Sequence, residues 1–316
     1  MKSLSFYGVD ISQATIDVGD WQSGEVQKIQ YTERTVRHWL QSLPEGARIA
    51  VESTGTLHRL LVHCAIAAGH IVYVLNARDL SHYARSLGRR AKTDRLDALL
   101  IARYLANEHQ HLHPFRLPSK VQQQVDELIS RRHKVVVMRE ALRQSFTGMK
   151  LSSLNTVKKS FTRLIAQIDQ QLACLIAQDE QLAPIAKRLR TVVGFGPLLS
   201  TAMTHALTRH PFQSADAFIA YVGYDPGARD SGQKHGRRHL SKRGPAEMRR
   251  LLFNAAMSAC KTKLWQPFYQ RYRDRGLPST AALVILARKL ARIAFSIAKN
   301  GTTFNPELVK TACALP

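Results

Sequence analysis

Short segments follow a strict order in the first third of the chain: three strand-like stretches, then alternating helical and strand-like stretches. In the first of them apolar and polar residues alternate up to Asp10, which is typical of a strand with one buried face. The next two are separated by Gln-Ser-Gly-Glu, which favours a hairpin meander. The predicted strands are 3–12, 14–21, 26–32, 47–54 and 71–77, and the predicted helices are 33–43, 57–69 and 93–109.

Three hairpin strands followed by alternating helices and strands predict a mixed sheet with helices on its faces. This is the order of an RNase H-like fold, which we assign to residues 1–115. Pro114 and Pro118 mark its end. Two long stretches nearly free of Gly and Pro predict an antiparallel helical arm over 116–185, used in oligomerisation, although two ordinary core helices would give a similar pattern. A mainly helical region, 186–316, completes an α/β plus α chain.

The charge of the chain points to a polyanionic partner. Its 46 Lys and Arg against 23 Asp and Glu give a net charge of +23, which repels itself in a compact fold. Nucleic acid is favoured over an anionic membrane, because no basic amphipathic stretch stands apart from the folded pattern. The sequence has no secretory pattern or membrane-spanning run, so we expect a cytoplasmic protein. Four scattered cysteines indicate neither a disulfide framework nor a zinc site.

Four acidic residues fall at the ends of predicted elements. Asp10 ends the first strand and Glu52 the fourth, and these strands are neighbours in the predicted sheet. Asp94 and Asp97 begin the following helix, where residues three apart share a face. Carboxylates that converge in this way repel one another unless cations lie among them, and their oxygens suit Mg²⁺ or Mn²⁺. A pair of such ions stabilises the attacking and leaving oxygens of phosphoryl transfer.

Each acid also has an ordinary explanation. Taken alone, Asp10 could form a turn, and Glu52 could cap the next helix. Asp94 could be an ordinary acid at a helix start, and Asp97 could form an ion pair. Together they match the positions that a metal-dependent nuclease site requires. The stretch "GVDIS" is also similar to the first phosphate loop of actin-like ATPases, but the sequence shows no second glycine-rich phosphate loop. Lys92 and Arg95 are candidates for phosphate contact or charge balance beside the acids.

Residues 228–250 form a glycine-containing segment with eight Lys and Arg and two acids, a local charge of +6. This density fits phosphate contacts, although a solvated loop has the same pattern. Ser241 lies within the segment, and a serine hydroxyl becomes a nucleophile only with help from neighbouring groups. Ser231 is a rival, and a serine shortly before a helix is more often a turn or cap residue. The pattern alone leaves this choice open.

A second phosphate-contact candidate is the G-x-G turn in "VVGFGP". It is similar to the turn of a helix-hairpin-helix, whose backbone amides contact phosphate, but a tight interhelical turn has the same glycine requirement. The predicted nucleic-acid contacts in this turn and the basic segment are Gly194, Gly196, Lys234, Arg237, Arg238, Lys242 and Arg243.

Six motifs together resemble one family. They are "YGVDIS", "VESTGT", "KTDRLDALLIA", "VVGFGP", "AYVGYDPGARDSGQKHG" and "LSKRGPAEMRRLLFNAA". Over nearly its full length the chain resembles the DEDD insertion-sequence transposases and recombinases (the "one-ten" family), which include pilin-gene invertases and RNA-guided bridge recombinases. The K-T-D-x-x-D-A block combined with the serine block is specific. Met248 stands where the family usually has Leu, a mild change in core packing.

The resemblance implies a RuvC-like domain and a covalent mechanism. The implied Mg²⁺ (or Mn²⁺) ligands and catalytic acids are Asp10, Glu52, Asp94 and Asp97. It implies Ser241, rather than Ser231, as the nucleophile that forms a covalent link to a DNA phosphate. The implied partners are donor and target DNA, a noncoding guide RNA and further copies of the chain, from dimer to tetramer, with the acids of one subunit meeting the serine of another. A bacterial, nucleoid-associated location follows.

Three hypotheses of different classes therefore stand. The first is a serine recombinase or transposase that depends on Mg²⁺. The second is a metal-dependent RuvC-like nuclease that activates water, or an invertase that works without guide RNA. The third is a basic nucleic-acid-binding scaffold whose acids are structural.

Overall fold

The computed structural model describes residues 4–53, 57–88, 94–227, 230–231, 234–235 and 239–309. The chain divides into two compact units, 1–117 and 118–316, which we call unit 1 and unit 2 and describe separately. Within the described residues, none of the helices combines the length and apolar character needed to span a membrane.

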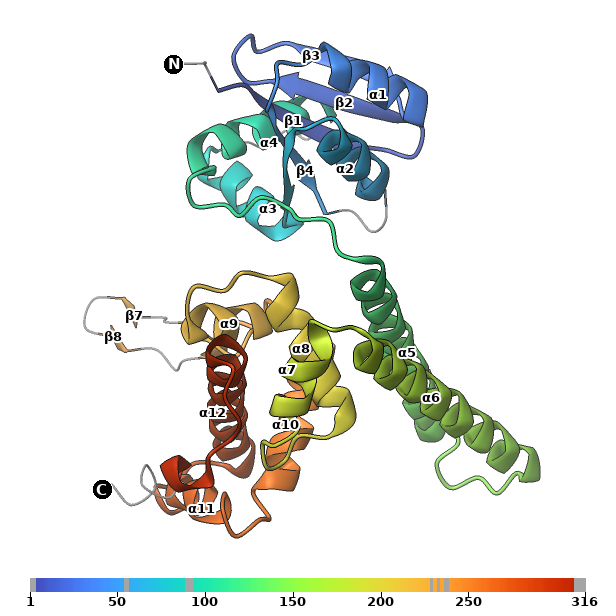
Figure 1. Cartoon of the computed structure of the whole chain (residues 1–316), viewed down its shortest axis with the longest axis vertical. Coiled ribbons are helices and arrows are strands. Elements are labelled where there is room, and N and C mark those ends of the chain that lie inside the picture. The colour runs from blue at the N-terminus through green and yellow to red at the C-terminus, as the bar shows by residue number, and fades with distance from the viewer. Residues whose placement is uncertain are drawn as a thin grey trace. The chain divides into compact units, whose positions relative to one another are not determined.

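Unit 1 is built on a five-stranded mixed sheet with the order β3-β2-β1-β4-β5 (Figure 1). β1 pairs antiparallel with β2 and parallel with β4, so the predicted neighbourhood of the first and fourth strands is confirmed. The strands are β1 (Phe6–Ile11), β2 (Thr15–Asp20), β3 (Val26–Gln30), β4 (Arg48–Glu52) and β5 (Ile71–Leu75). The helices are α1 (Glu33–Ser42), α2 (His58–Ala67), α3 (Ala77–Ser86) and α4 (Asp94–Glu108).

The two faces of this sheet bury different residues. On one face Val9 and Val51 belong to an apolar cluster with the inner sides of α1 and α2. On the other face Phe6, Ala50 and Tyr73 pack with Ile101 and Leu105 of α4. Successive side chains of each strand therefore point to opposite faces of the sheet, and both faces are covered by helices.

Two glycines let α4 lie directly on the strands. A Cβ atom on Gly8 would overlap the backbone of Ala98 and stand 2.9 Å from the Ala102 Cα. A Cβ on Gly19, which pairs with Gly8 across β1 and β2, would stand 2.9 Å from the Ala98 carbonyl carbon. The other end of α4 lies near the start of β1, where the His109 and Phe6 rings are 4.9 Å apart. The helix therefore runs antiparallel to β1, and its first turn lies toward the strand's carboxyl end.

Unit 2 begins with the helical arm, formed by α5 (Lys120–Ser145) and α6 (Ser152–Gln178). The two helices lie side by side (Figure 1) and bury Val125 against Ile168 and Leu172. The sequence has no Gly or Pro from residue 152 to residue 182, so the pattern alone would continue α6 to residue 182. It ends earlier because the Asp179 carboxylate accepts hydrogen bonds of 2.9 Å from the Gln181 and Leu182 amides, which starts a new helix.

A second cluster of helices completes unit 2, around an apolar core that includes Phe218, Trp265 and Leu290. These helices are α7 (Leu182–Leu189), α8 (Pro197–Arg209), α9 (Ala215–Val222), α10 (Ala246–Ala259), α11 (Gln266–Asp274) and α12 (Ser279–Asn300). The segment between α9 and α10 contains two short strand pairs. They are β6 (Pro226–Gly227) with β9 (His239–Leu240), and β7 (Asp230–Ser231) with β8 (Lys234–His235).

His210 at the end of α8 gives unit 2 a testable dependence on pH. Its ring lies 4.9 Å from that of Tyr221, and burial, followed by electrostatic interaction with Arg209 and His205, lowers its pKa from 6.5 to about 4. In the unfolded chain the imidazole takes up a proton near its ordinary pKa, whereas in the folded chain it stays neutral. The free energy of unfolding should therefore fall as pH drops from about 6.5 to about 4.

The matched variant is His210→Phe, which keeps an aromatic ring and removes the titrating group. Urea unfolding at several pH values measures the free energy of unfolding of both proteins. We expect the wild type to lose more stability than the variant across this pH window. Equal losses would contradict the role of His210.

Candidate active site

The first candidate site, the acid edge, comprises Asp10, Glu52, Asp94 and Asp97. Asp10 is the penultimate residue of β1 and Glu52 the last of β4. The register of these strands pairs Gly8 with Ala50 and Val9 with Val51, so Asp10 and Glu52 come next at the carboxyl ends. Both are partly buried, and both belong to the sheet face that α4 covers. The sheet therefore holds two of the predicted acids side by side.

The other two acids lie in the first turn of α4. Asp97 is partly buried and immediately precedes Ala98, which touches Gly8 and Gly19. Asp94 is the first helical residue, and its side chain lies outside the described part of the structure. Because α4 runs antiparallel to β1, this turn lies toward the carboxyl ends of the strands. The side chains that are described include no set of three or more His, Cys, Asp or Glu placed to hold a metal ion. A four-carboxylate metal site thus stays a prediction.

A fifth carboxylate, Asp17 on β2, was not anticipated from the sequence. It pairs directly with Asp10 across β1 and β2, so both side chains leave the same face of the sheet. Only 7% of Asp17 is exposed, and its carboxylate lies 3.3 Å from the Lys28 Nζ on β3. The sequence does contain a signal for Asp17, because it is an acidic residue inside the predicted strand 14–21. The ion pair with Lys28 offsets part of the negative charge gathered at this edge.

The donor set of the acid edge fits a hard divalent cation. Carboxylate oxygens are the ligands that Mg²⁺ and Mn²⁺ prefer, and Asp10 and Glu52 come from rigid, adjacent strands. Lys92, the predicted basic neighbour, lies outside the described residues, whereas Arg95 is exposed on the first turn of α4.

The second candidate site, the serine loop, comprises residues 223–225 and 239–244 in unit 2. The strand pair β6–β9 brings these segments together, with Pro226 opposite Leu240. Just beyond it, the Ser241 amide donates a 2.9 Å hydrogen bond to the Asp225 carbonyl, and the Lys242 amide donates one of 3.1 Å to the Gly223 carbonyl. Ser241 is therefore held on a short two-stranded ladder and not on a free loop.

The Ser241 hydroxyl has a defined partner. Its Oγ donates a hydrogen bond to the Asp225 Oδ1, and both residues are partly buried. The Arg243 amide points at the same Oγ from 3.5 Å. The side chain does not cap the following helix, because the N-cap of α10 is Pro245 and no side chain bonds there. Asp225 is thus a second residue that sequence inspection missed, since its partner lies 16 positions away.

Close backbone packing braces the serine loop. Lys242 has φ of +52°, a left-handed conformation that costs a non-glycine residue about 1–2 kcal/mol. A Cβ on Gly244 would overlap the Tyr221 carbonyl oxygen and lie 2.6 Å from the Val222 carbonyl carbon. The Arg249 Nη1 donates to the carbonyls of Val222, at 3.1 Å, and of Gly244, at 2.5 Å. The surrounding structure therefore holds Ser241 in one place.

The basic residues near Ser241 divide into two groups. Lys242 and Arg243 are exposed beside it, as contact with a phosphate would require. Arg249 and Arg250 instead make internal contacts, the latter with Glu247 at 2.6 Å. Part of the charge counted along the sequence therefore serves the fold. Among the other predicted contacts, the side chain of Lys234 is not described, and Arg237 and Arg238 lie outside the described residues.

The remaining candidates occupy ordinary structural positions. Gly194 has φ of +103°, and a Cβ there would stand 2.8 Å from the Ala259 Cβ of α10. Gly196 is the N-cap of α8 and faces open space. Ser231 pairs with Lys234 in the β7–β8 hairpin. Gly194 is thus explained by helix packing, while phosphate contact by the turn stays a prediction.

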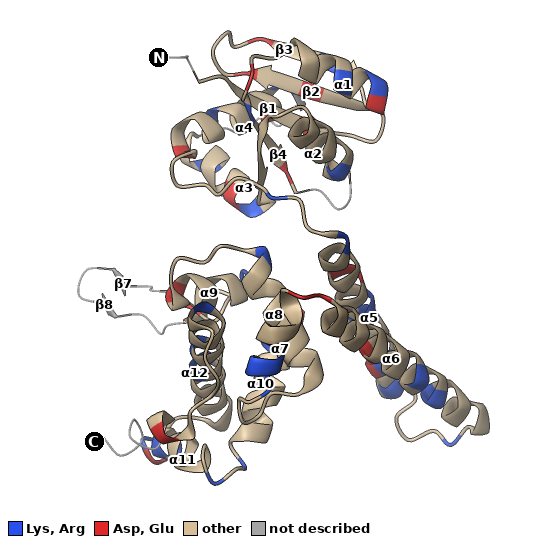
Figure 2. Ribbon diagram, in the orientation of Figure 1, with Lys and Arg blue, Asp and Glu red and all other residues tan. Residues whose placement is uncertain are grey.

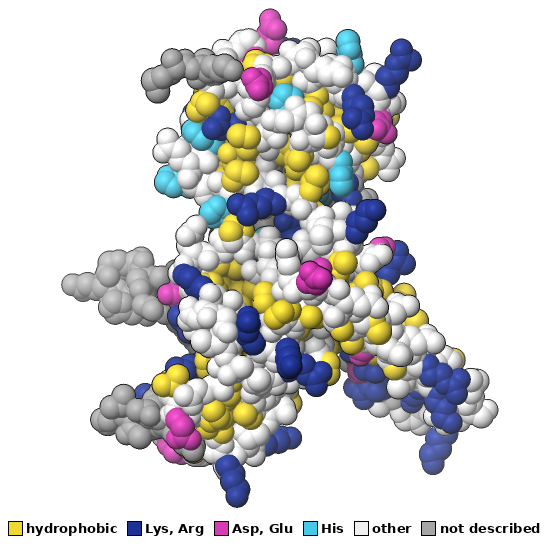
Figure 3. Space-filling view, in the orientation of Figure 1, with side chains coloured by type: hydrophobic (Ala, Val, Ile, Leu, Met, Phe, Trp, Pro, Cys, Tyr) yellow, Lys and Arg dark blue, Asp and Glu magenta, His cyan; other side chains and the backbone are white. Residues whose placement is uncertain are grey.

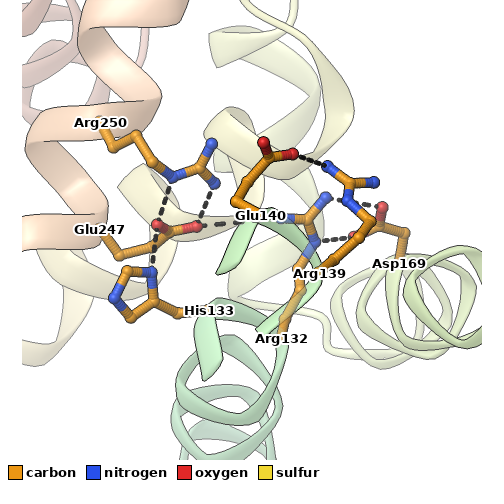
Figure 4. A network of polar contacts seen from close by, with 7 residues as sticks. All are labelled: Arg132, His133, Arg139, Glu140, Asp169, Glu247 and Arg250. Atoms are coloured by element: carbon orange, nitrogen blue, oxygen red, sulfur yellow. Dashed lines mark hydrogen bonds and ion pairs between the residues drawn. The ribbon is translucent and has the colours of Figure 1, made fainter. Parts of the chain in front are cut away.

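An ion network around the buried Glu247 ties the start of α10 to the arm (Figure 4). Glu247, 8% exposed, accepts hydrogen bonds of 2.7 Å from the His133 Nδ1 and 2.6 Å from the Arg250 Nη2. Arg132 lies 3.8 Å from the same carboxylate and also binds Asp169 of α6. The helix that follows the serine loop is therefore anchored to both arm helices.

Comparison with known proteins finds two family models that match this chain. A family model of DEDD transposases of the IS110 type matches residues 7–153, and a model described as the transposase IS116/IS110/IS902 family matches residues 186–272. The pilin gene-inverting proteins of Moraxella bovis and Moraxella lacunata are each 27% identical to the chain, across 97% of this chain and 99% of the relative. A probable family 20 transposase of Pseudomonas aeruginosa is 27% identical over 50% of this chain and 47% of its own length.

Proposed function

Since this chain belongs to the insertion-sequence transposase family and is therefore a DNA recombinase or transposase, we propose that it cuts and rejoins DNA through a covalent link to Ser241. The observation that carries the proposal is the Ser241 hydroxyl, hydrogen-bonded to the Asp225 carboxylate in a braced loop. A free serine hydroxyl is a poor nucleophile, and it needs both orientation and a neighbouring acceptor. Lys242 and Arg243 supply positive charge next to it for a phosphodiester.

Unit 1 is proposed to be an RNase H-like domain whose acid edge binds divalent metal. Its strand order and the pairing of β1 with β4 support this assignment. Asp10, Glu52, Asp94 and Asp97 would hold Mg²⁺ or Mn²⁺. Bound ions would neutralise charge on the phosphate and on the departing sugar oxygen. The carboxylates would hold these ions, and Ser241 supplies the nucleophile that attacks the scissile phosphate.

The arm is proposed to join copies of this chain into a dimer or tetramer. Apolar side chains that a soluble monomer would bury stay exposed on it, among them Met138 at 62% and Val137 at 52%. Leu164 on α6 is 43% exposed. Lys and Arg residues also follow both arm helices (Figures 2 and 3). These charges support DNA, and a noncoding guide RNA, as partners of the assembly.

A second candidate function is inversion of a DNA segment without a guide RNA. It is favoured by one finding, the similarity to pilin gene-inverting proteins over nearly the whole chain. Transposition and inversion share the same strand cleavage and rejoining, so the two candidates differ in the arrangement of DNA sites and not in the residues at Ser241.

The test is a covalent-adduct assay on supercoiled DNA that carries the gene with its natural flanks, in the presence of Mg²⁺. After denaturation, the wild type should leave DNA attached to protein. Ser241→Ala should reduce this adduct to the level of a protein-free control, because no Oγ remains to bond phosphorus. DNA binding should persist in the variant, since Lys242 and Arg243 are unchanged.

The matched control is Ser231→Ala, in the same segment. It should form the adduct like the wild type. An adduct that survives in Ser241→Ala, or one lost only in Ser231→Ala, would sink the assignment and favour a nuclease that activates water.

A further inference from the structure

We propose that Asp225 is the general base of the serine reaction, taking the proton from the Ser241 Oγ as it bonds to phosphorus and returning it when the strand is rejoined. This inference rests on the proposed function of Ser241 and adds a catalytic residue to it. The group touches the reacting atom itself, because Oγ donates its hydrogen bond to Asp225 Oδ1.

Ser241 and Asp225 are held against each other by the fold of the loop. They are joined twice, through the side chains and through the 2.9 Å bond from the Ser241 amide to the Asp225 carbonyl. Each comes from a position next to the β6–β9 pair, 16 residues apart in the chain. Turn and cap hydrogen bonds of serine or aspartate join residues that are close in sequence, so neither motif explains this contact.

The backbone on both sides keeps the pair together. Gly223, with φ of +78°, lies two residues before Asp225, and a Cβ on it would stand 2.8 Å from the Gly244 amide nitrogen. Lys242 takes the left-handed conformation directly after Ser241. A strained non-glycine backbone persists only where its surroundings hold it, and such strain is often found at functional sites. With Lys242 in this left-handed conformation, the amide of Arg243 faces the Ser241 Oγ.

The proposed step balances as follows. The Oγ–P bond forms and the bond from phosphorus to the departing sugar oxygen breaks, while the Oγ proton passes to Asp225. The departing oxygen takes a proton from water. In rejoining, a sugar hydroxyl of the incoming strand attacks phosphorus and gives its proton to solvent, the Oγ–P bond breaks, and Asp225 returns the proton to Oγ. The carboxylate is regenerated, and no further reactant is consumed.

The test compares Asp225→Asn and Asp225→Glu in the full chain, using the same supercoiled DNA and Mg²⁺. Asn keeps an oxygen that can accept the serine hydrogen bond but loses the basic carboxylate. We expect it to slow adduct formation by about 10²- to 10⁴-fold, the usual contribution of a positioned base. Glu keeps the carboxylate and should recover a substantial part of that loss. Thermal unfolding and DNA binding of both variants show whether the loop still folds.

The pH profile separates a base from a structural support. In Asp225→Asn, which lacks the base, the rate should follow the hydroxide concentration, whereas the wild-type rate should not depend on hydroxide in this way. A wild-type rate and profile in Asp225→Asn would overturn the inference while leaving Ser241 as the nucleophile. Equal losses in folded Asn and Glu variants would overturn it as well. Absence of any wild-type adduct at Ser241 would instead refute the proposed function beneath it.

Discussion

Replacement of Gly8 by alanine is expected to destabilise unit 1 by about 3 kcal/mol and to stop the chemistry that depends on the acid edge. The added methyl group would overlap the backbone of Ala98 and approach the Ala102 Cα to 2.9 Å. Backbone atoms cannot rotate away as a side-chain end can, so α4 must move off the sheet. Asp97, which adjoins Ala98, would then shift away from Asp10.

Urea unfolding and the covalent-adduct assay measure the two parts of this expectation. Gly46→Ala is the matched control in unit 1, because its Cβ would meet open space and only its left-handed backbone, φ of +69°, opposes the change. That cost is about 1–2 kcal/mol. The expectation fails if Gly8→Ala unfolds at the same urea concentration as Gly46→Ala and keeps full adduct formation.

Truncation of Glu247 should be the most damaging change in unit 2. Glu247→Ala removes a carboxylate that is 8% exposed and leaves Arg132, His133 and Arg250 facing one another without it. Removing one partner of a buried charge pair costs about 3–5 kcal/mol. Here only Arg132, 12% exposed, stays desolvated, whereas His133 and Arg250 are about one third exposed, so we expect a loss of about 3 kcal/mol. The serine loop, which leads directly into α10, should lose its alignment at the same time.

Glu140→Ala provides the comparison for this prediction. Glu140 also pairs with two arginines, Arg139 and Arg143, and the hydrogen bond from Arg143 lowers its pKa, but its side chain is 41% exposed. Water screens such a pair, so the free energy of unfolding should change little. Urea unfolding of both variants, with adduct formation as a second reading, decides between them. Similar losses in the free energy of unfolding of the two variants would show that the burial of Glu247 does not increase its contribution to stability.

Much of unit 1 could be predicted from the sequence, because its information is local. Alternating strands, helix signals and the acids at their ends all depend on near neighbours, and they predicted the pairing of β1 with β4 correctly. The sequence pattern predicts no helix where the structure has α3. In α3 the charged, His- and Ser-containing stretch 77–86 buries only Leu80, so its apolar signal is weak.

The partners of the candidate site residues could not be predicted in the same way. Asp17 meets Asp10 through strand pairing, and Asp225 meets Ser241 across a short ladder. Both contacts depend on the register in which the strands pair, and this register cannot be read from the sequence. The inward role of Arg249 depends on two carbonyls that only the folded loop brings together. Local pattern located the acids and the basic segment, whereas tertiary packing decided what each of their residues touches.

The direction of α4 has an electrostatic consequence. Its 15 residues align their peptide dipoles, which places about half a positive charge at the helix N-terminus. Because the helix runs antiparallel to β1, this end lies toward the strand ends that carry Asp10 and Glu52. The positive end of the dipole therefore attracts negative charge at these strand ends before any cation arrives. The peptide backbone of α4, which no side-chain substitution removes, thus helps to stabilise the negative charges at the acid edge.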